Sequence, residues 1–186
     1  AGILAEHPPQ GEIVQEVTGP RSQMDMVSAL PDDHAHDKCG VVGVYSPQRD
    51  AARLAFFGIF ALQHRGQESA GIASSDGEQL HVHRSTGLVT EAFSQAQQQQ
   101  LPGNMAIGHV RYTTAGASDN LNAQPLVFRY SGGQVAVAHN GNLVNAQRLR
   151  TQLERQGSIF QTTTDTEVIP HLIARAGPPI LDAVQD

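Results

Sequence analysis

The sequence predicts a mixed α+β fold in which antiparallel strand pairs dominate. Short runs rich in β-branched residues alternate with apolar stretches of helical length, and two pairs of these runs are joined by glycine-containing turns. With 186 residues, the chain is long enough for one compact domain and an extra segment. It is 39% hydrophobic and 16% charged and has no apolar run of membrane-spanning length, which excludes disordered, collagen-like and transmembrane classes.

Residues 1–38 are predicted to form a flexible leader or propeptide, and residues 39–186 the folded domain. The leader holds four prolines and an acidic, histidine-containing stretch at 32–37, without a sustained apolar period. It also lacks the basic start and the apolar core of a secretory signal peptide, which favours a cytoplasmic, reducing location. The composition changes abruptly at Cys39.

The first strand is expected at 39–45, where a mostly β-branched run suits a strand buried on both faces. A helix capped by Asp50 follows. Leu54, Phe57 and Ala61 recur at helical spacing in it. Because this apolar stripe is widened almost all round the helix, we expect the helix to be buried against a sheet. The widening residues are Phe56, Ile59, Phe60 and Leu62.

Two hairpins and four further elements complete the pattern. Asp76-Gly77 is a favourable hairpin turn between strands at 70–75 and 78–84, and Ser131-Gly132-Gly133 joins strands at 126–130 and 134–139. The other expected elements are a helix from about Thr90 to Gln100, a strand at 105–112, and helices at 145–155 and 164–175.

The charge and the cysteine count exclude several kinds of partner and site. Twelve basic against eighteen acidic residues give a net charge of -6, which argues against a nucleic-acid partner. A single cysteine excludes an internal disulfide framework and any CxxC metal site. No metal site is predicted in the domain. A weaker alternative is a divalent-ion site formed by His34, His36 and neighbouring aspartates of the leader, with Cys39 as a further candidate ligand.

Cys39 is the first candidate for chemistry. A lone cysteine is most often a small buried hydrophobe. Cys39, however, lies where the leader meets the first strand, and removal of the leader would give it a free α-amine with a pKa near 7.7 to 8.0, beside a thiol near 8.5. Such an amine can act as the base that activates the side chain of its own residue, so nucleophile and base would share one residue.

Two loops that follow strands supply candidate binding groups. Arg111 could be a surface charge, but at a strand end its planar guanidinium can hold a carboxylate bidentately, with Thr114 adding a hydroxyl. Asn140-Gly141 could be a simple turn. Its alternative role is an oxyanion hole, because the Asn140 amide and the Gly141 N–H are two donors that can converge on one oxygen.

The segment at 164–167 matches a helix capping box, with Thr164 as the cap and Glu167 reaching back to it. This arrangement would leave Asp165 free in the first turn to accept an ammonium group. A polar loop at 63–69 follows the apolar helix, and a cation at a helix end is its simplest interpretation.

Together these motifs resemble the class II glutamine amidotransferases, and among them the amidophosphoribosyltransferases of purine synthesis. The resemblance covers Cys39 to about Arg175 and rests on six segments in the family's order. They are the cysteine-glycine start, LQHRGQESAGI at 62–72, GHVRYTTAG at 108–116, NAQPL at 122–126, AHNGNLVN at 138–145 and TDTE at 164–167. The related hexosamine-forming enzymes tend to have EYRGYDS and RWATHG where this chain has QHRGQES and RYTTAG, and so resemble it less.

The resemblance implies an N-terminal-nucleophile hydrolase fold, a four-layer αββα sandwich, whose last strands would lie beyond Asp186. It implies that Cys39 is the nucleophile and that its terminal amine, exposed by removal of the leader, is the base. Asn140 and Gly141 match the oxyanion hole. The residues that match the binding site of the amino-acid end of glutamine are Arg111, Thr114 and Asp165, and those of a loop beside the nucleophile are Arg65 and Gly66.

The implied reaction is hydrolysis of the glutamine side-chain amide through a cysteine thioester, with ammonia passing to phosphoribosyl pyrophosphate in a separate phosphoribosyltransferase domain. No cofactor is implied for this segment. Mg²⁺ is expected with the other domain, an iron-sulfur cluster is possible in the full-length protein, and the full-length protein is expected to be a homo-oligomer with no membrane partner. Two alternatives stay open, an unprocessed, non-catalytic interaction or regulatory module of the same fold and another class II amidotransferase.

Overall fold

The computed structural model describes residues 39–48, 50–112 and 120–176. Its strands are β1 (Gly40–Tyr45), β2 (Ser69–Ser75), β3 (Leu80–Thr86), β4 (Met105–Arg111), β5 (Leu126–Tyr130) and β6 (Gly133–Val137). Its helices are α1 (Ala51–Ala61), α2 (Val89–Ala92), α3 (Gln95–Gln99), α4 (Ala146–Arg155) and α5 (Val168–Ala176). Three short 3₁₀ turns are η2 (Gln63–Arg65), η3 (Asn120–Asn122) and η4 (Asp165–Glu167).

Both predicted hairpins are present. The four-stranded sheet is antiparallel with the order β1-β4-β2-β3, and β5 and β6 form a separate antiparallel pair. In the first hairpin, Asp76 Oδ1 accepts hydrogen bonds from the backbone N–H groups of Glu78 at 2.9 Å and Gln79 at 2.8 Å. Gly77 has a φ of 98°, which favours glycine. The local turn chemistry therefore accounts for this hairpin.

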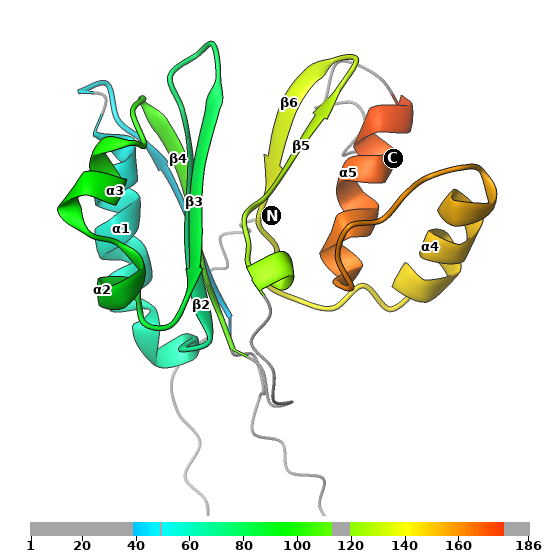
Figure 1. Ribbon diagram of the computed structural model, residues 1–186, viewed down its shortest axis with the longest axis horizontal. Helices are drawn as coiled ribbons and strands as arrows, with labels where there is room; N and C mark the ends of the chain where they lie inside the picture. The colour runs from blue at the N-terminus through cyan, green and yellow to red at the C-terminus, as the bar shows by residue number, and fades with distance from the viewer. Residues whose placement is uncertain (1–38, 49, 113–119, 177–186) are drawn as a thin grey trace, which may run out of the picture. The chain divides into compact units, whose positions relative to one another are not determined.

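The elements form four layers, which confirms the predicted α+β class (Figure 1). Helices α1 and α2 pack on one face of the four-stranded sheet, and the β5–β6 hairpin lies on the other side of that sheet. Strand β3 packs against β6, where the backbone N–H of Leu80 donates to Gln134 Oε1 at 2.8 Å. Helix α5 in turn packs on β6, and α4 packs on α5.

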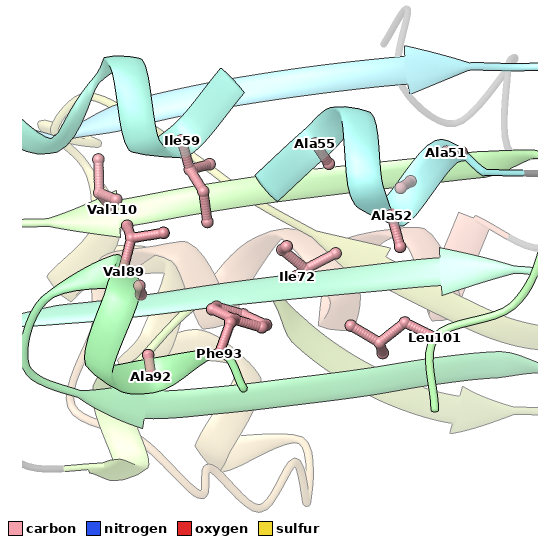
Figure 2. Close-up of a cluster of buried hydrophobic side chains, with 12 residues drawn as sticks. Ala51, Ala52, Ala55, Ile59, Ile72, Val89, Ala92, Phe93, Leu101 and Val110 are labelled. Carbon is pink, nitrogen blue, oxygen red and sulfur yellow. The ribbon is translucent and has the colours of Figure 1, made fainter. Parts of the chain in front are cut away.

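The main apolar core lies between α1, α2 and the four-stranded sheet (Figure 2). The face of α1 that contacts the sheet carries small residues and Ile59, whereas Leu54 is 44% and Phe57 52% exposed. The expectation that this helix is buried against a sheet is confirmed, but Leu54 and Phe57 of its apolar stripe are not part of the buried face. A Cβ on Gly108 of β4 would lie 2.6 Å from Ile59 Cγ2, so the helix approaches the strand closely and presents its small residues to it.

Strand β1 was expected to be buried on both faces, and this expectation is wrong. Its side chains alternate between the two faces, so that Val42 and Val44 pack against the core, whereas Val41 is 38% and Tyr45 68% exposed. Asp50 occupies the N-cap position of α1, but its side chain makes no capping hydrogen bond and instead accepts one from Ser46 Oγ.

The single helix expected from Thr90 to Gln100 is divided into α2 and α3. Ser94 begins the second helix as a capping residue, because its hydroxyl oxygen accepts from the Gln97 N–H at 3.3 Å while Gln97 Oε1 accepts from the Ser94 N–H at 2.6 Å. None of the helices in the described part of the chain combines the length and the apolar character needed to cross a bilayer.

Candidate active site

A cavity of about 380 Å³ lies where several predicted site residues meet. Its walls include Cys39, Arg111, Gly141 and Asp165, which come from the start of β1, the end of β4, the loop after β6 and η4. Its other lining residues are Tyr112, Gln124, His139, Asn142, Thr163, Thr164 and Thr166. The fold therefore brings together one candidate nucleophile, one cation and one anion from distant parts of the sequence.

Cys39 is partly buried and lies at the same end of the sheet as Arg111, because the next residue, Gly40, pairs with Val110 of β4. The backbone carbonyl of Cys39 accepts a hydrogen bond from Arg65 Nε at 3.0 Å. A Cβ on Gly66 would lie 2.7 Å from the backbone carbonyl carbon of Arg111. The loop of Arg65 and Gly66 thus contacts both the cysteine and the strand end that carries Arg111.

Arg111 is held on two sides. Its Nη1 donates to the backbone carbonyl of Asn122 at 2.8 Å, and its Nε lies 3.4 Å from Glu68 Oε2. The side chains of Arg111 and Glu68 are 22% and 11% exposed, so the ion pair is only partly screened by solvent. These contacts orient the guanidinium of a residue that lines the cavity, and a planar guanidinium is suited to a carboxylate ligand.

Asp165 is oriented by the loop after β6. Its Oδ2 accepts a hydrogen bond from the Leu143 N–H at 2.7 Å, which ties η4 to the segment that contains Gly141. Gly141 lines the cavity, whereas its neighbour Asn140 is exposed and is not among the lining residues. The oxyanion role of Asn140 and Gly141 stays a prediction, as do the binding roles of Arg111 and Asp165. Thr114 lies outside the described residues.

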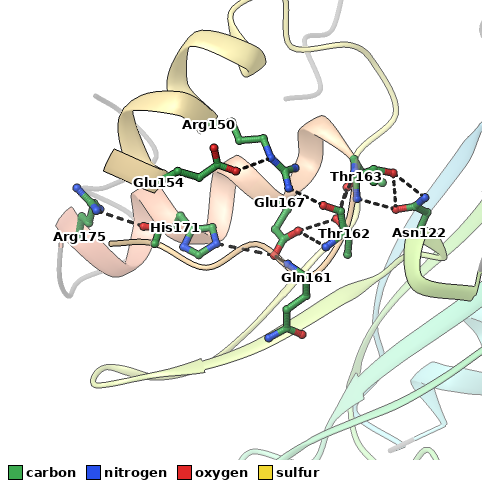
Figure 3. Close-up of polar contacts among 11 residues, drawn as sticks. Asn122, Arg150, Glu154, Gln161, Thr162, Thr163, Glu167, His171 and Arg175 are labelled. Carbon is green, nitrogen blue, oxygen red and sulfur yellow. Dashed lines mark hydrogen bonds and ion pairs between the residues drawn. The ribbon is translucent and has the colours of Figure 1, made fainter. Parts of the chain in front are cut away.

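Glu167 does not complete the predicted capping box with Thr164. It is fully buried, and its carboxylate accepts hydrogen bonds from the Gln161 N–H at 2.7 Å, the Thr162 N–H at 2.6 Å and Thr162 Oγ1 at 2.7 Å (Figure 3). Thr164 makes no side-chain capping bond. The carboxylate thus reaches beyond the expected cap and fixes the loop that leads to Asp165.

Sequence reasoning assigned no individual roles to Gln124 and His139, although both line the cavity. Gln124 is buried, and its Oε1 accepts from the His139 N–H at 2.8 Å while its Nε2 donates to Thr166 Oγ1 at 3.1 Å. Gln124 belongs to the NAQPL segment, one of the motifs on which the family resemblance rests. That motif was the only sequence signal for Gln124, and the residue type alone does not indicate these contacts.

His109 is a further residue that the sequence did not single out. It is fully buried in β4, and neither ring nitrogen has a hydrogen bond of normal geometry within the described ranges. Burial lowers the pKa of His109 to about 4, and the nearby backbone of His139 offsets this effect only in part. His109 is therefore a neutral imidazole near neutral pH.

The described residues contain no group of three or more His, Cys, Asp or Glu side chains able to hold a metal ion. His34 and His36, on which the metal-binding alternative depends, lie outside those residues.

Comparisons with known proteins agree on one family. A family model for a glutamine amidotransferase domain matches residues 94–185. An amidophosphoribosyltransferase of Bacillus subtilis is 52% identical over 143 residues, which are 76% of this chain and 30% of the relative. A chloroplastic amidophosphoribosyltransferase of Arabidopsis thaliana is 54% identical over 144 residues, 77% of this chain and 26% of the relative.

Solved structures give the same result. One described as the allosteric regulatory enzyme of purine biosynthesis has a TM-score of 0.74 and 50% identity, over 78% of this chain and 31% of that one. Glutamine phosphoribosylpyrophosphate amidotransferase from B. subtilis, in complex with ADP and GMP, has a TM-score of 0.71 and 48% identity over the same shares.

The layered fold and the cysteine-containing cavity define an N-terminal-nucleophile hydrolase domain of the class II glutamine amidotransferases. Within that class, the chain belongs to the amidophosphoribosyltransferase family, whose members it matches at about half of the aligned positions. The chain spans between 26% and 30% of the length of these two curated relatives.

Proposed function

We propose that this chain is the glutaminase part of an amidophosphoribosyltransferase. It hydrolyses the side-chain amide of glutamine and supplies the ammonia that converts phosphoribosyl pyrophosphate into 5-phosphoribosylamine, the first committed step of purine synthesis. The observation that carries this proposal is the cavity in which Cys39, Arg111, Gly141 and Asp165 meet.

Substrate binding follows from the two opposite charges in the cavity. A free amino acid carries an α-carboxylate and an α-ammonium, and burying either without a partner is costly. Arg111 binds the carboxylate and Asp165 the ammonium, with Thr114 adding a hydroxyl. The side chain of glutamine then extends toward Cys39, which lies in the wall of the same cavity.

The chemistry requires the α-amine of Cys39 to be free, so maturation removes residues 1–38. That amine accepts the thiol proton, and the thiolate forms a C–S bond with the amide carbon. The resulting oxyanion is stabilised by the N–H of Gly141 and the side-chain amide of Asn140. The ammonium of Cys39 returns the proton to the leaving nitrogen, the C–N bond breaks and ammonia departs. Water then cleaves the thioester to give glutamate and the free thiol.

The ammonia acceptor is bound by another part of the enzyme. Phosphoribosyl pyrophosphate carries several phosphate charges, and the Mg²⁺ expected with it would bind beside those phosphates. This division predicts that a substitution in the glutaminase site leaves the acceptor reaction with added ammonia unchanged.

Replacement of the nucleophile tests the proposal. In the mature, full-length protein, Cys39→Ala should abolish glutamine-dependent formation of phosphoribosylamine and preserve its formation from added ammonia. Intact mass spectrometry of the wild-type protein should show that Cys39 is the first residue. Survival of glutamine use in the variant would reject Cys39 as nucleophile, and full activity in protein that retains Ala1 would reject the terminal amine as base. An inactive protein that retains Ala1 would favour a non-catalytic module.

A further inference from the structure

The two charged residues proposed to bind glutamine come from different parts of the fold. Arg111 ends β4 in the four-stranded sheet, and Asp165 begins η4 beyond the second hairpin. An α-amino acid presents its carboxylate and ammonium on one carbon atom, at a fixed separation. A site that uses both groups therefore needs a structural link that fixes the distance from Arg111 to Asp165.

Asn122, the last residue of η3, makes this link. Its backbone carbonyl accepts the hydrogen bond from Arg111 Nη1 at 2.8 Å. Its side chain contacts Thr163, where Nδ2 donates to Thr163 Oγ1 at 2.9 Å and Oδ1 accepts from the Thr163 N–H at 3.1 Å (Figure 3). One residue thus contacts Arg111 with its main chain and the loop before Asp165 with its side chain.

The loop that Asn122 contacts is held firmly on its other side. Buried Glu167 accepts from the N–H groups of Gln161 and Thr162, and Asp165 accepts from Leu143. Because the loop is fixed in this way from Gln161 to Asp165, a contact at Thr163 also constrains the position of Asp165, which lies two residues further along. The paired hydrogen bonds of the Asn122 amide also fix the orientation of the loop, which a single bond would not do.

We propose that Asn122 is a positioning residue that sets the separation between Arg111 and Asp165 and so makes the site selective for substrates carrying both an α-carboxylate and an α-ammonium. This inference rests on the proposed glutamine-binding function. Loss of the Asn122 amide leaves both charged residues in place but loosens their spacing. A ligand that uses both anchors then loses affinity, whereas a ligand that uses only one anchor does not.

The test compares ligands with two groups and with one group in the mature, full-length enzyme. Asn122→Ala should raise KM for glutamine about tenfold and change kcat by less than about twofold. Two analogues that keep the side-chain amide serve as competitive inhibitors. Glutaramate lacks the α-ammonium and 4-aminobutanamide lacks the α-carboxylate, and the inhibition constant of each should change by less than about twofold.

Asn120→Ala is the matched control, because Asn120 lies in the same 3₁₀ turn, is exposed and does not line the cavity. It should leave all these constants unchanged. Thr163→Ala removes the partner hydroxyl, so by itself it should raise KM for glutamine by a smaller factor than Asn122→Ala. In the double variant it should add little to the effect of Asn122→Ala, because both substitutions remove the same contact.

Three results would overturn the inference. They are an unchanged KM for glutamine in Asn122→Ala, equal weakening of glutamine and both analogues, and full additivity of the Asn122 and Thr163 substitutions. A wild-type enzyme that releases no ammonia from glutamine would instead reject the proposed function itself. If Asn122→Ala fails to fold, the glutamine and analogue constants of Thr163→Ala decide the question.

Discussion

Replacement of His109 should remove a large part of the acid sensitivity of this fold. The imidazole is fully buried and has a pKa of about 4, against about 6.5 in an unfolded chain. Between these values the unfolded state binds more protons than the folded state, so the free energy of unfolding rises with pH. Well above pH 6.5, His109 is neutral in both states and the free energy of unfolding is at its full value. As pH falls toward 4, protonation of His109 in the unfolded state lowers that free energy. From pH 7 to pH 5 this loss amounts to about 2 kcal/mol.

His109→Leu keeps a side chain of similar size and cannot take up a proton. Because neither ring nitrogen has a hydrogen bond of normal geometry among the described residues, the variant should be destabilised by less than about 1.5 kcal/mol at pH 7. Urea denaturation of the purified protein at pH 7 and pH 5, followed by circular dichroism, measures both effects. His64→Gln, at an exposed histidine, is the control and should retain the full pH dependence. The reasoning is refuted if His109→Leu loses as much stability between the two pH values as the wild type.

Four further substitutions test the site and its support. Arg111→Ala should mainly raise KM for glutamine, whereas Asn140→Ala should mainly lower kcat, by roughly 10² to 10³; a change in KM alone for Asn140→Ala would favour the simple turn. Gly66→Ala places a methyl group against the Arg111 backbone and should lower the free energy of unfolding by about 1–3 kcal/mol, measured by thermal or urea unfolding. Gly43→Ala, with open space around its Cβ position, should lower it far less. Equal losses of stability in the two variants would contradict the contact. Glu167→Gln replaces one of two accepting oxygens by an amide N–H₂, which then faces a backbone N–H donor, and should lower stability by about 1–3 kcal/mol. An unchanged unfolding midpoint would show that the carboxylate is not needed.

The parts of the fold that depend on local chemistry could be predicted from the sequence. The hairpin at Asp76-Gly77 follows from an aspartate that accepts two backbone N–H groups and a glycine with positive φ. The buried face of α1 could not be predicted in the same way. Which face of α1 packs on the sheet depends on the absence of a side chain at Gly108, and this residue lies in a strand far along the sequence.

The candidate site shows the same division. Motif segments indicated Cys39, Arg111 and Asp165, and the structure places all three in one cavity. The contacts that orient them involve Glu68, Asn122 and other polar residues whose partners are distant in sequence. Because a polar residue has the same local pattern whether its partner is water or a buried side chain, spacing alone did not reveal these supporting roles.

The hydrogen bond from Arg65 to the Cys39 carbonyl gives an unusual property to a proposed chain end. A polypeptide terminus normally frays, and ordering its backbone costs roughly 1–2 kcal/mol per residue. Here the first residue after the proposed cleavage is anchored through its carbonyl, and the next residue already belongs to the sheet. The mature terminus would therefore keep one orientation while its amine and thiol stay accessible to exchange protons. A nucleophile inside a folded element has a fixed position because the chain is ordered on both sides of it. Here the nucleophile would have a fixed position although it lies at the end of the chain.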